Sequence, residues 1–468
     1  MQLSHTLPVA SATFDDPNLV SAAGLVPVMA LAEEAGLRAL GDEHLSLPTD
    51  KGANAGAKLA ALVAGMAAGA DSIEDLGLLR HGAMGKVFDR PYAPSTLGSF
   101  LRAFTFGHVR QGDAVASRFT LAMAEQSGLL GKAGDTGTVL LDMDDTIVEV
   151  HGYAKQGAGF GYTGVRGLNA LLATVTTDQA APVIAAQRLR KGCVGSSRGA
   201  VRLATDALAL VRRSHLAARP VLLRADSAFY SATLVGAAIK AGAQVSITVR
   251  LDPAVKRAIA SIDDDAWTTI RYTDAIYDET TKTWVSRAEV AEVPYTAFTS
   301  AKKAQQVTGR LVVRRIPDLN HKAKDGQASL FDTFRFHAFF TTTPVTERGT
   351  VAADQVHRGH AIIENVHADL KASALAHLPS GTFTANAIWL IAATMAFNLT
   401  RAAATLTGST QLARATTPTI RRKLINLPAR IASSARRLHL HLPRDWPWQD
   451  AWTALYAALL PNPAPAPT

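Results

Sequence analysis

Three carboxylates lie in one apolar stretch, LLDMDDTIVE, residues 140–149. An apolar run of this length predicts a buried strand, whose side chains alternate between two faces. Asp142 and Asp144 should therefore point one way and Asp145 the other. Two ionised carboxylates on one face repel each other, and a divalent cation with oxygen ligands, Mg²⁺ or Mn²⁺, relieves that repulsion. The stretch thus predicts either a metal site or a carboxylate nucleophile.

The nucleophile interpretation rests on the pattern D-x-D-x-T made by Asp142, Asp144 and Thr146. This pattern resembles the signature of haloacid-dehalogenase-like phosphatases, which implies Asp142 as nucleophile and Asp144 as acid/base. That family also carries a downstream lysine and an acidic pair after a later strand. The later run VLLRADSAF supplies one acid, Asp226, with no acid four positions on. The phosphatase resemblance is therefore confined to the first strand.

The metal interpretation draws on two more acids. Asp226 ends an apolar run, as Asp144 does, and Glu364 lies in HRGHAIIENVHADLK. On a helix His357, His360, Glu364 and Lys371 follow at steps of three, four and seven, so they share one face. A carboxylate flanked by imidazole and ammonium groups suits a metal ion beside a phosphodiester.

Together these segments resemble the DDE transposases of bacterial insertion sequences, in the branch whose third acid lies in a helix reading Y-x2-R-x3-E-x6-K. Here the helix reads His357-x2-His360-x3-Glu364-x6-Lys371, with His at the Tyr and Arg positions. The segments LDMDDT, QGAGFGYTG, RADSAFY and LPARI also resemble actinobacterial-type members. The resemblance implies two Mg²⁺ (or Mn²⁺) ions held by Asp144, Asp226 and Glu364, supported by Asp142, Thr146, His357, His360 and Lys371.

The activity implied by this resemblance is phosphoryl transfer on DNA: strand cleavage at the transposon ends and strand transfer to target DNA, by a homodimer in the synaptic complex. Two alternatives stay open. One is the phosphatase that uses the D-x-D-x-T strand. The other is a non-catalytic, domesticated DNA-binding protein, although the intact trio of acids speaks against it.

Charge also favours a nucleic-acid partner. The formal net charge is +9, and residues 401–468 hold nine basic and two acidic side chains. Such asymmetry is typical of proteins that bind polyanions. We expect DNA phosphates to be bound by basic residues of RLRKGCVGSSR, of the third-acid helix and of the C-terminal region: Arg188, Arg190, Lys191, Arg198, Arg358, Arg421, Arg422, Lys423, Arg430, Arg436 and Arg437.

Composition limits the remaining possibilities. The chain is 48% hydrophobic and 19% charged, which is typical of globular proteins. A single cysteine excludes an intramolecular disulfide and a cysteine metal cluster. The N-terminus does not read as a signal peptide, and the apolar runs fall short of the ~20 residues of a membrane span. A cytoplasmic location fits this composition, and the transposase resemblance implies a bacterial, nucleoid-associated protein.

The order of expected elements is βββαβαβ from residue 137, which predicts an α/β mixed sheet that begins like the ribonuclease-H fold. We expect five parts: a helical N-terminal domain with possible DNA end binding (1–136), the first part of the catalytic core (137–252), a β-rich insertion (253–345), the second part of the core with the glutamate helix (346–407), and a basic C-terminal helical region (408–468).

Overall fold

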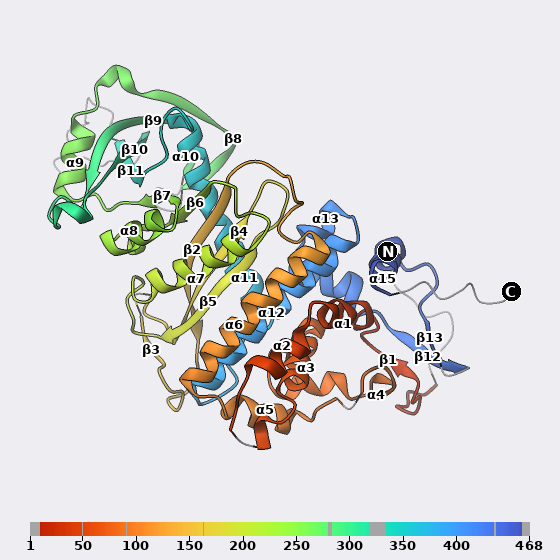
Figure 1. The fold of residues 1–468 in the computed structure, drawn as a ribbon. Helices are drawn as coiled ribbons and strands as arrows, with labels where there is room; N and C mark the ends of the chain where they lie inside the picture. The colour runs from red at the N-terminus through yellow and green to blue at the C-terminus, as the bar shows by residue number, and fades with distance from the viewer. Residues whose placement is uncertain are drawn as a thin grey trace.

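A mixed sheet of ten strands runs through the molecule (Figure 1). The computed structural model describes residues 10–48, 50–89, 91–161, 163–278, 283–317, 334–434 and 437–460. The strand order is β3-β4-β2-β6-β7-β11-β10-β9-β8, with β5 paired to β4. The predicted mixed α/β class is confirmed.

The catalytic part of the sheet follows the predicted order. The strands β2 (Val139–Glu149), β4 (Arg166–Thr176) and β5 (Val183–Lys191) are antiparallel neighbours, and β3 (Gly159–Phe160) is a short addition to β4. After helix α7 (Ala200–Arg213), β6 (Val221–Ala225) pairs with β2 in parallel. Helix α8 (Ala232–Lys240) leads to β7 (Ala243–Thr248), parallel to β6. Central parallel strands are covered on both faces, which explains why their sequences are continuous apolar runs.

The β-rich segment continues this sheet instead of forming a sheet of its own. Helix α9 (Pro253–Ala260) is followed by β8 (Thr268–Asp278), β9 (Thr283–Ala297), β10 (Val307–Pro317) and β11 (Phe334–Thr341). The last of these strands, β11, pairs antiparallel with β7, where Phe340 lies opposite Ile247. The strands form where the alternating sequence predicts them, and they lengthen the catalytic sheet at the β7 edge.

Helices cover the opposite end of the sheet, beyond β5. The N-terminal part contains α1 (Leu25–Glu34), α2 (Leu37–His44), α3 (Ala55–Ala68), α4 (Met84–Val87), α5 (Pro94–Arg102) and α6 (Phe106–Ser127). Of these, α1, α3, α5 and α6 pack against α12 (Phe383–Leu406), and α6 lies alongside it (Figure 1). Among the described residues α12 is the one helix long and apolar enough to cross a membrane, and its whole apolar window is buried inside the fold. It forms the central helix of the protein core.

The C-terminal region differs from the predicted all-helical arrangement. It contains α13 (Thr410–Ala413), α14 (Thr417–Ile420), a π-helical turn (Arg421–Ile425) and α15 (Gln449–Leu459), but also the hairpin β12 (Ala429–Ser434) and β13 (Arg437–His441). Strand β12 pairs with β1 (Leu19–Val20) near the start of the chain. The two ends of the chain therefore share one small sheet (Figure 1).

Candidate active site

The first two predicted acids are neighbours across two parallel strands. The register of β2 and β6 places Asp142 beside Arg224 and Met143 beside Ala225, so the next position on each strand is an acid, Asp144 and Asp226. Asp226 directly follows β6 and accepts a hydrogen bond from the Ala228 N–H at 3.0 Å. The structure thus brings together two carboxylates that lie 82 positions apart in the sequence, as predicted from the two strand ends.

The electrostatics of this pair favour protonation in the absence of a cation. Burial, with a smaller contribution from the charge of Asp226, raises the pKa of Asp144 to about 7, while a hydrogen bond from the Asp145 N–H opposes the shift. Burial likewise raises the pKa of Asp226. Both shifts disfavour the charged forms, as expected for partly desolvated carboxylates that face each other.

Asp142 is held inside the protein by an arginine. Its side chain is fully buried, and both oxygens accept hydrogen bonds from Arg224, from Nε and Nη2, each at 2.7 Å. The Nδ1 atom of His360 lies 2.9 Å from one of these oxygens. Bidentate arginine pairing of this kind fixes geometry as well as charge. Asp142 is therefore a support of the site, and its carboxylate is not free to act as the nucleophile of a phosphatase.

Asp145 points to the other face of β2, as the alternation predicts, and enters a second buried network. It accepts hydrogen bonds from Asn169 at 2.6 Å, from Ser196 at 3.2 Å and from Arg190. Arg190 also donates to the carbonyls of Ser196 and Arg198, at 2.6 and 2.8 Å. The network ties the loop before α7 to the strand that carries Asp144. Arg190 is 6% exposed, so its predicted role in binding DNA phosphate is wrong.

The predicted histidine-rich helix is two helices with a short break between them. Helix α10 (Thr350–Arg358) ends, a 3-10 turn follows (Gly359–Ala361), and α11 (Ile362–Lys371) begins. Arg224 donates to the Val356 carbonyl in the last turn of α10, and a Cβ on Gly359 would lie 2.9 Å from the same guanidinium. A side chain from the neighbouring strand thus interrupts the helical hydrogen bonds.

His357 packs against β7 and β11. It stacks on Phe339 with ring centroids 4.0 Å apart and bonds with Ser246 and Thr248 of β7, at 2.9 and 3.0 Å. Burial lowers its pKa to about 3, so the ring is neutral near pH 7. His357 thus contacts β7 and β11, and its predicted shared face with Glu364 stays a prediction.

Helix α11 carries a histidine that the sequence interpretation missed. The Nδ1 atom of His367 lies 3.6 Å from an Asp144 oxygen, and burial lowers the pKa of His367 to about 4. His360 and His367 therefore approach the two aspartates of one β2 face, and Glu364 lies between them on the same helical stripe. Glu364 itself is exposed. The step of three from Glu364 to His367 is visible in the sequence, but its contact with Asp144 is not.

Helix α11 is anchored at its C-terminal end by a buried ion pair. Asp369 binds Arg401 of α12 at 2.9 Å and accepts hydrogen bonds from the Thr417 N–H at 3.0 Å.

A cavity of about 350 Å³ beside the end of β2 is lined by Lys371 and Thr146. Two predicted supporting residues are therefore brought together at the edge of the site.

The donor atoms present suit a hard divalent cation. Asp144 and Asp226 supply carboxylate oxygens, which Mg²⁺ and Mn²⁺ prefer, and a cation would offset the effects that raise their pKa values. Across the described residues no group of three His, Cys, Asp or Glu side chains is already gathered around one point. The participation of Glu364 stays a prediction.

The predicted DNA-binding residues differ in their exposure and in their contacts. Lys191, Arg198, Arg422, Arg430 and Arg437 are exposed. Arg188 bonds with Asp206 at 3.5 Å, Arg358 with Asp354 at 2.8 Å, and the Lys423 ammonium lies over the Trp448 ring. Arg421 donates to the Ala67 and Met66 carbonyls and to Ser373, so it joins α3 to α11 and is a structural residue. Arg436 lies outside the described residues.

Comparison with known proteins agrees with this geometry. Residues 6–464 match the family described as Transposase DDE domain group 1, which covers nearly the whole chain. No curated protein matches the chain. The match spans the paired strand-end aspartates, the extended sheet and the C-terminal region alike, and it implies transposition of DNA. The chain belongs to the DDE transposase family.

Proposed function

We propose that this transposase cleaves DNA at the ends of a bacterial, actinobacterial-type insertion sequence and joins them to target DNA through Asp144, Asp226 and Glu364. The adjacency of Asp144 and Asp226 across β2 and β6 carries the proposal. Helix α11 supports it, because His360 and His367 lie against the aspartates of β2 on either side of Glu364. A bend of the Glu364 side chain toward the pair completes the trio.

Two Mg²⁺ or Mn²⁺ ions, when bound by these carboxylates, supply stabilisation of charge on the attacking and leaving oxygens of an in-line displacement. The protein itself fixes the donors. Arg224 and His360 hold Asp142 and thereby dock α11 on β2. The neutral His367 ring covers one side of Asp144, so its carboxylate is directed toward Asp226 without competing positive charge.

The DNA strand is placed by groups around the acids. Lys371 and Thr146 line the adjoining cavity, where an ammonium and a hydroxyl can bind a backbone phosphate. Exposed Lys191 is the last residue of β5, and exposed Arg198 lies in the loop that Arg190 ties to β2. We further propose that the protein acts in the bacterial cytoplasm at the nucleoid, as a homodimer that pairs two DNA ends.

The direct test is cleavage of a duplex carrying the element's end. Asp144→Asn, Asp226→Asn and Glu364→Gln should each lower the cleavage rate by roughly 10²-fold or more, because each removes transition-state charge stabilisation worth several kcal/mol. End binding, measured by fluorescence anisotropy, should change little. Asp265→Asn, an exposed acid of the β-rich segment, is the control. Full cleavage by any one of the three variants would exclude that residue from the trio.

A further inference from the structure

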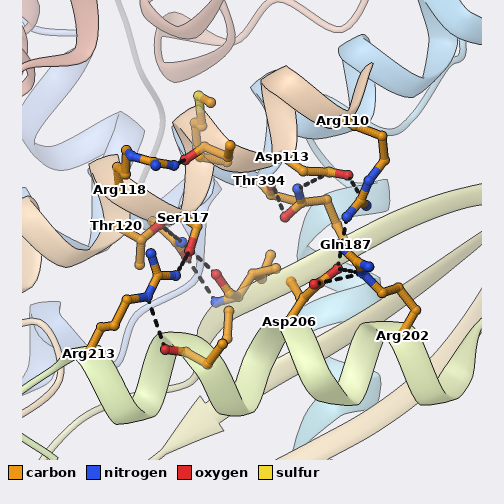
Figure 2. Close-up of a pocket in the computed structure, with 18 residues that line it drawn as sticks. Arg110, Asp113, Ser117, Arg118, Thr120, Gln187, Arg202, Asp206, Arg213 and Thr394 are labelled. Carbon is orange, nitrogen blue, oxygen red and sulfur yellow. Dashed lines mark hydrogen bonds and ion pairs between the residues drawn. The ribbon is translucent and has the colours of Figure 1, made fainter. Parts of the chain in front are cut away.

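A polar cavity lies at the β5 edge of the sheet, away from the acids. It has a volume of about 320 Å³ and opens between α6, α7, β5 and α12 (Figure 2). Four arginines and two aspartates line it: Arg110, Arg118, Arg202, Arg213, Asp113 and Asp206. The lining therefore has an excess of positive charge.

The two aspartates are already paired at one end of the cavity. Arg110 bonds with Asp113 at 2.6 Å and with Asp206 at 3.3 Å, and Arg202 bonds with Asp206 at 3.0 Å. Asp113 also accepts a hydrogen bond from Gln187 of β5 at 3.0 Å. This end is a closed network in which each carboxylate is satisfied by the protein.

The other end holds two arginines that have no carboxylate partner among the described residues. Arg213 of α7 donates to Ser117 of α6 at 2.8 Å (Figure 2), and Arg118 donates to the Ala114 carbonyl at 3.2 Å. Both arginines are exposed, so their guanidinium groups keep unused N–H donors. Two guanidinium groups and a hydroxyl at one end of a cavity form an arrangement suited to an anion with several oxygens.

The wall behind this end is rigid. Asn398 of α12, 1% exposed, accepts the Ile184 N–H at 3.0 Å and donates to the Ile184 carbonyl at 2.9 Å. It also donates to the buried Thr120 hydroxyl at 3.2 Å. The backbone N–H and carbonyl of Ile184 in β5 are thereby both hydrogen-bonded to α12. The lining consequently presents Ser117, Arg118 and Arg213 from fixed helices rather than from loops.

We propose that the Ser117, Arg118 and Arg213 end of this cavity binds a phosphate group. The ligand chemistry is that of a DNA phosphodiester or of a free phosphate compound, and guanidinium forks match either. DNA is the source that the position favours. Gln187, at the paired end of the cavity, lies opposite Leu172, which lies opposite Asp144, so that end lies two strands from Asp144, about 10 Å between backbones. The proposed phosphate end lies further along α6 and α7. As a contact for transposon or target DNA, the site rests on the proposed function.

The test compares charge-removing variants with a neighbour on the same helix. Arg118→Ala with Arg213→Ala should weaken anisotropy-measured binding of an end duplex at least about tenfold and reduce the slope of log K against log salt by about 1, because one phosphate contact is lost. Ser117→Asp should have a similar effect on affinity without removing either arginine, because it supplies the missing carboxylate. Arg212→Ala, exposed and outside the cavity lining, should leave both quantities unchanged.

A second arm uses pyrophosphate in calorimetric titrations of the full-length protein. Loss of pyrophosphate binding in the double variant with unchanged duplex binding would support the site and assign it to a free phosphate compound. Unchanged binding of both ligands by the double variant and by Ser117→Asp would overturn the proposal. Cleavage at saturating DNA separates the two proposals, because these variants keep Asp144, Asp226 and Glu364 and should retain it.

Discussion

Asp144 and Asp226 occupy the same level on adjacent parallel strands, one residue beyond the Met143–Ala225 pair. Strand geometry therefore fixes the spacing of these two acids, whereas the third comes from a separate helix. Burial raises the pKa of both carboxyl groups, so their charged forms are disfavoured in the metal-free fold. The stability of an Asp144→Asn variant measures this effect.

Asp144→Asn should stabilise the metal-free protein at alkaline pH. The pKa of Asp144 is raised from 3.8 to about 7, so the folded state holds a proton that the unfolded state releases between these values. Stability from this group is present below pH 3.8 and is lost as pH rises toward 7. In EDTA at pH 8 the variant should exceed wild type by as much as about 4 kcal/mol, with no gain near pH 4. Urea unfolding at both pH values measures this; equal stabilities at pH 8 would contradict it.

Asp142→Ala should destabilise the fold far more than Asp144→Ala. Removing Asp142 leaves Arg224, 2% exposed, without its carboxylate partner. Breaking a buried pair in this way costs about 3–5 kcal/mol. Unfolding free energies in urea provide the comparison. The double variant Asp142→Leu with Arg224→Met should recover part of the loss, and a fully stable Asp142→Ala protein would show that the pair does not support the site.

Arg421→Ala should lower the stability of the fold, whereas Arg422→Ala, in the same helical turn, should weaken DNA binding. Arg421 makes three hydrogen bonds to α3 and Ser373, so its loss should lower the free energy of unfolding by about 1–3 kcal/mol. Arg422 is exposed, and its loss should reduce the salt slope of DNA binding by about 1 while the melting temperature stays constant. The opposite assignment of the two effects would mean that Arg421 binds DNA.

Gly24→Ala should weaken the junction of the chain ends. A Cβ at Gly24 would lie 1.8 Å from the Leu424 carbonyl oxygen and 2.6 Å from the Ile425 Cα, so the two backbones must separate. We expect a loss of about 2 kcal/mol or more, by analogy with overpacked cores. Gly85→Ala, where nothing lies within 4 Å, is the matched control and should be neutral or slightly stabilising. Equal melting temperatures for the two variants would refute the expectation.

The sequence predicted the sheet well because the signals of its strands are local. The runs around Asp144 and Asp226 are apolar and end at acids, and α12 is apolar throughout, so each could be read from a short window. The strands β12 and β13 differ from the predicted helix, and RLHLH alternates with period two, as a strand does. The basic residues of this region favour the DNA-binding interpretation, which does not depend on its secondary structure.

The errors at the site come from contacts between distant segments. No local pattern shows that Arg224 of β6 contacts the last turn of α10 or that Arg190 of β5 is buried by Asp145 of β2, because the partners are far apart in the sequence. Spacing predicts His357 on the face of Glu364, but it does not show the contacts of His357 with Ser246 and Thr248. The roles of Asp142 and Asp144 were distinguishable only once their partners were known.

The pairing of β1 with β12 has a consequence for synthesis on the ribosome. Val20 finds its partner, Ala429, only after 409 further residues have been made, which at about 5–20 residues per second takes tens of seconds. Until then the Leu19–Val20 edge is unpaired, and the Ala23 and Gly24 amides lack the Leu427 and Ile425 carbonyls that they bond. A nascent or prematurely terminated chain therefore exposes an open strand edge at its N-terminus, which makes it a substrate for chaperones and proteases rather than a smaller working transposase.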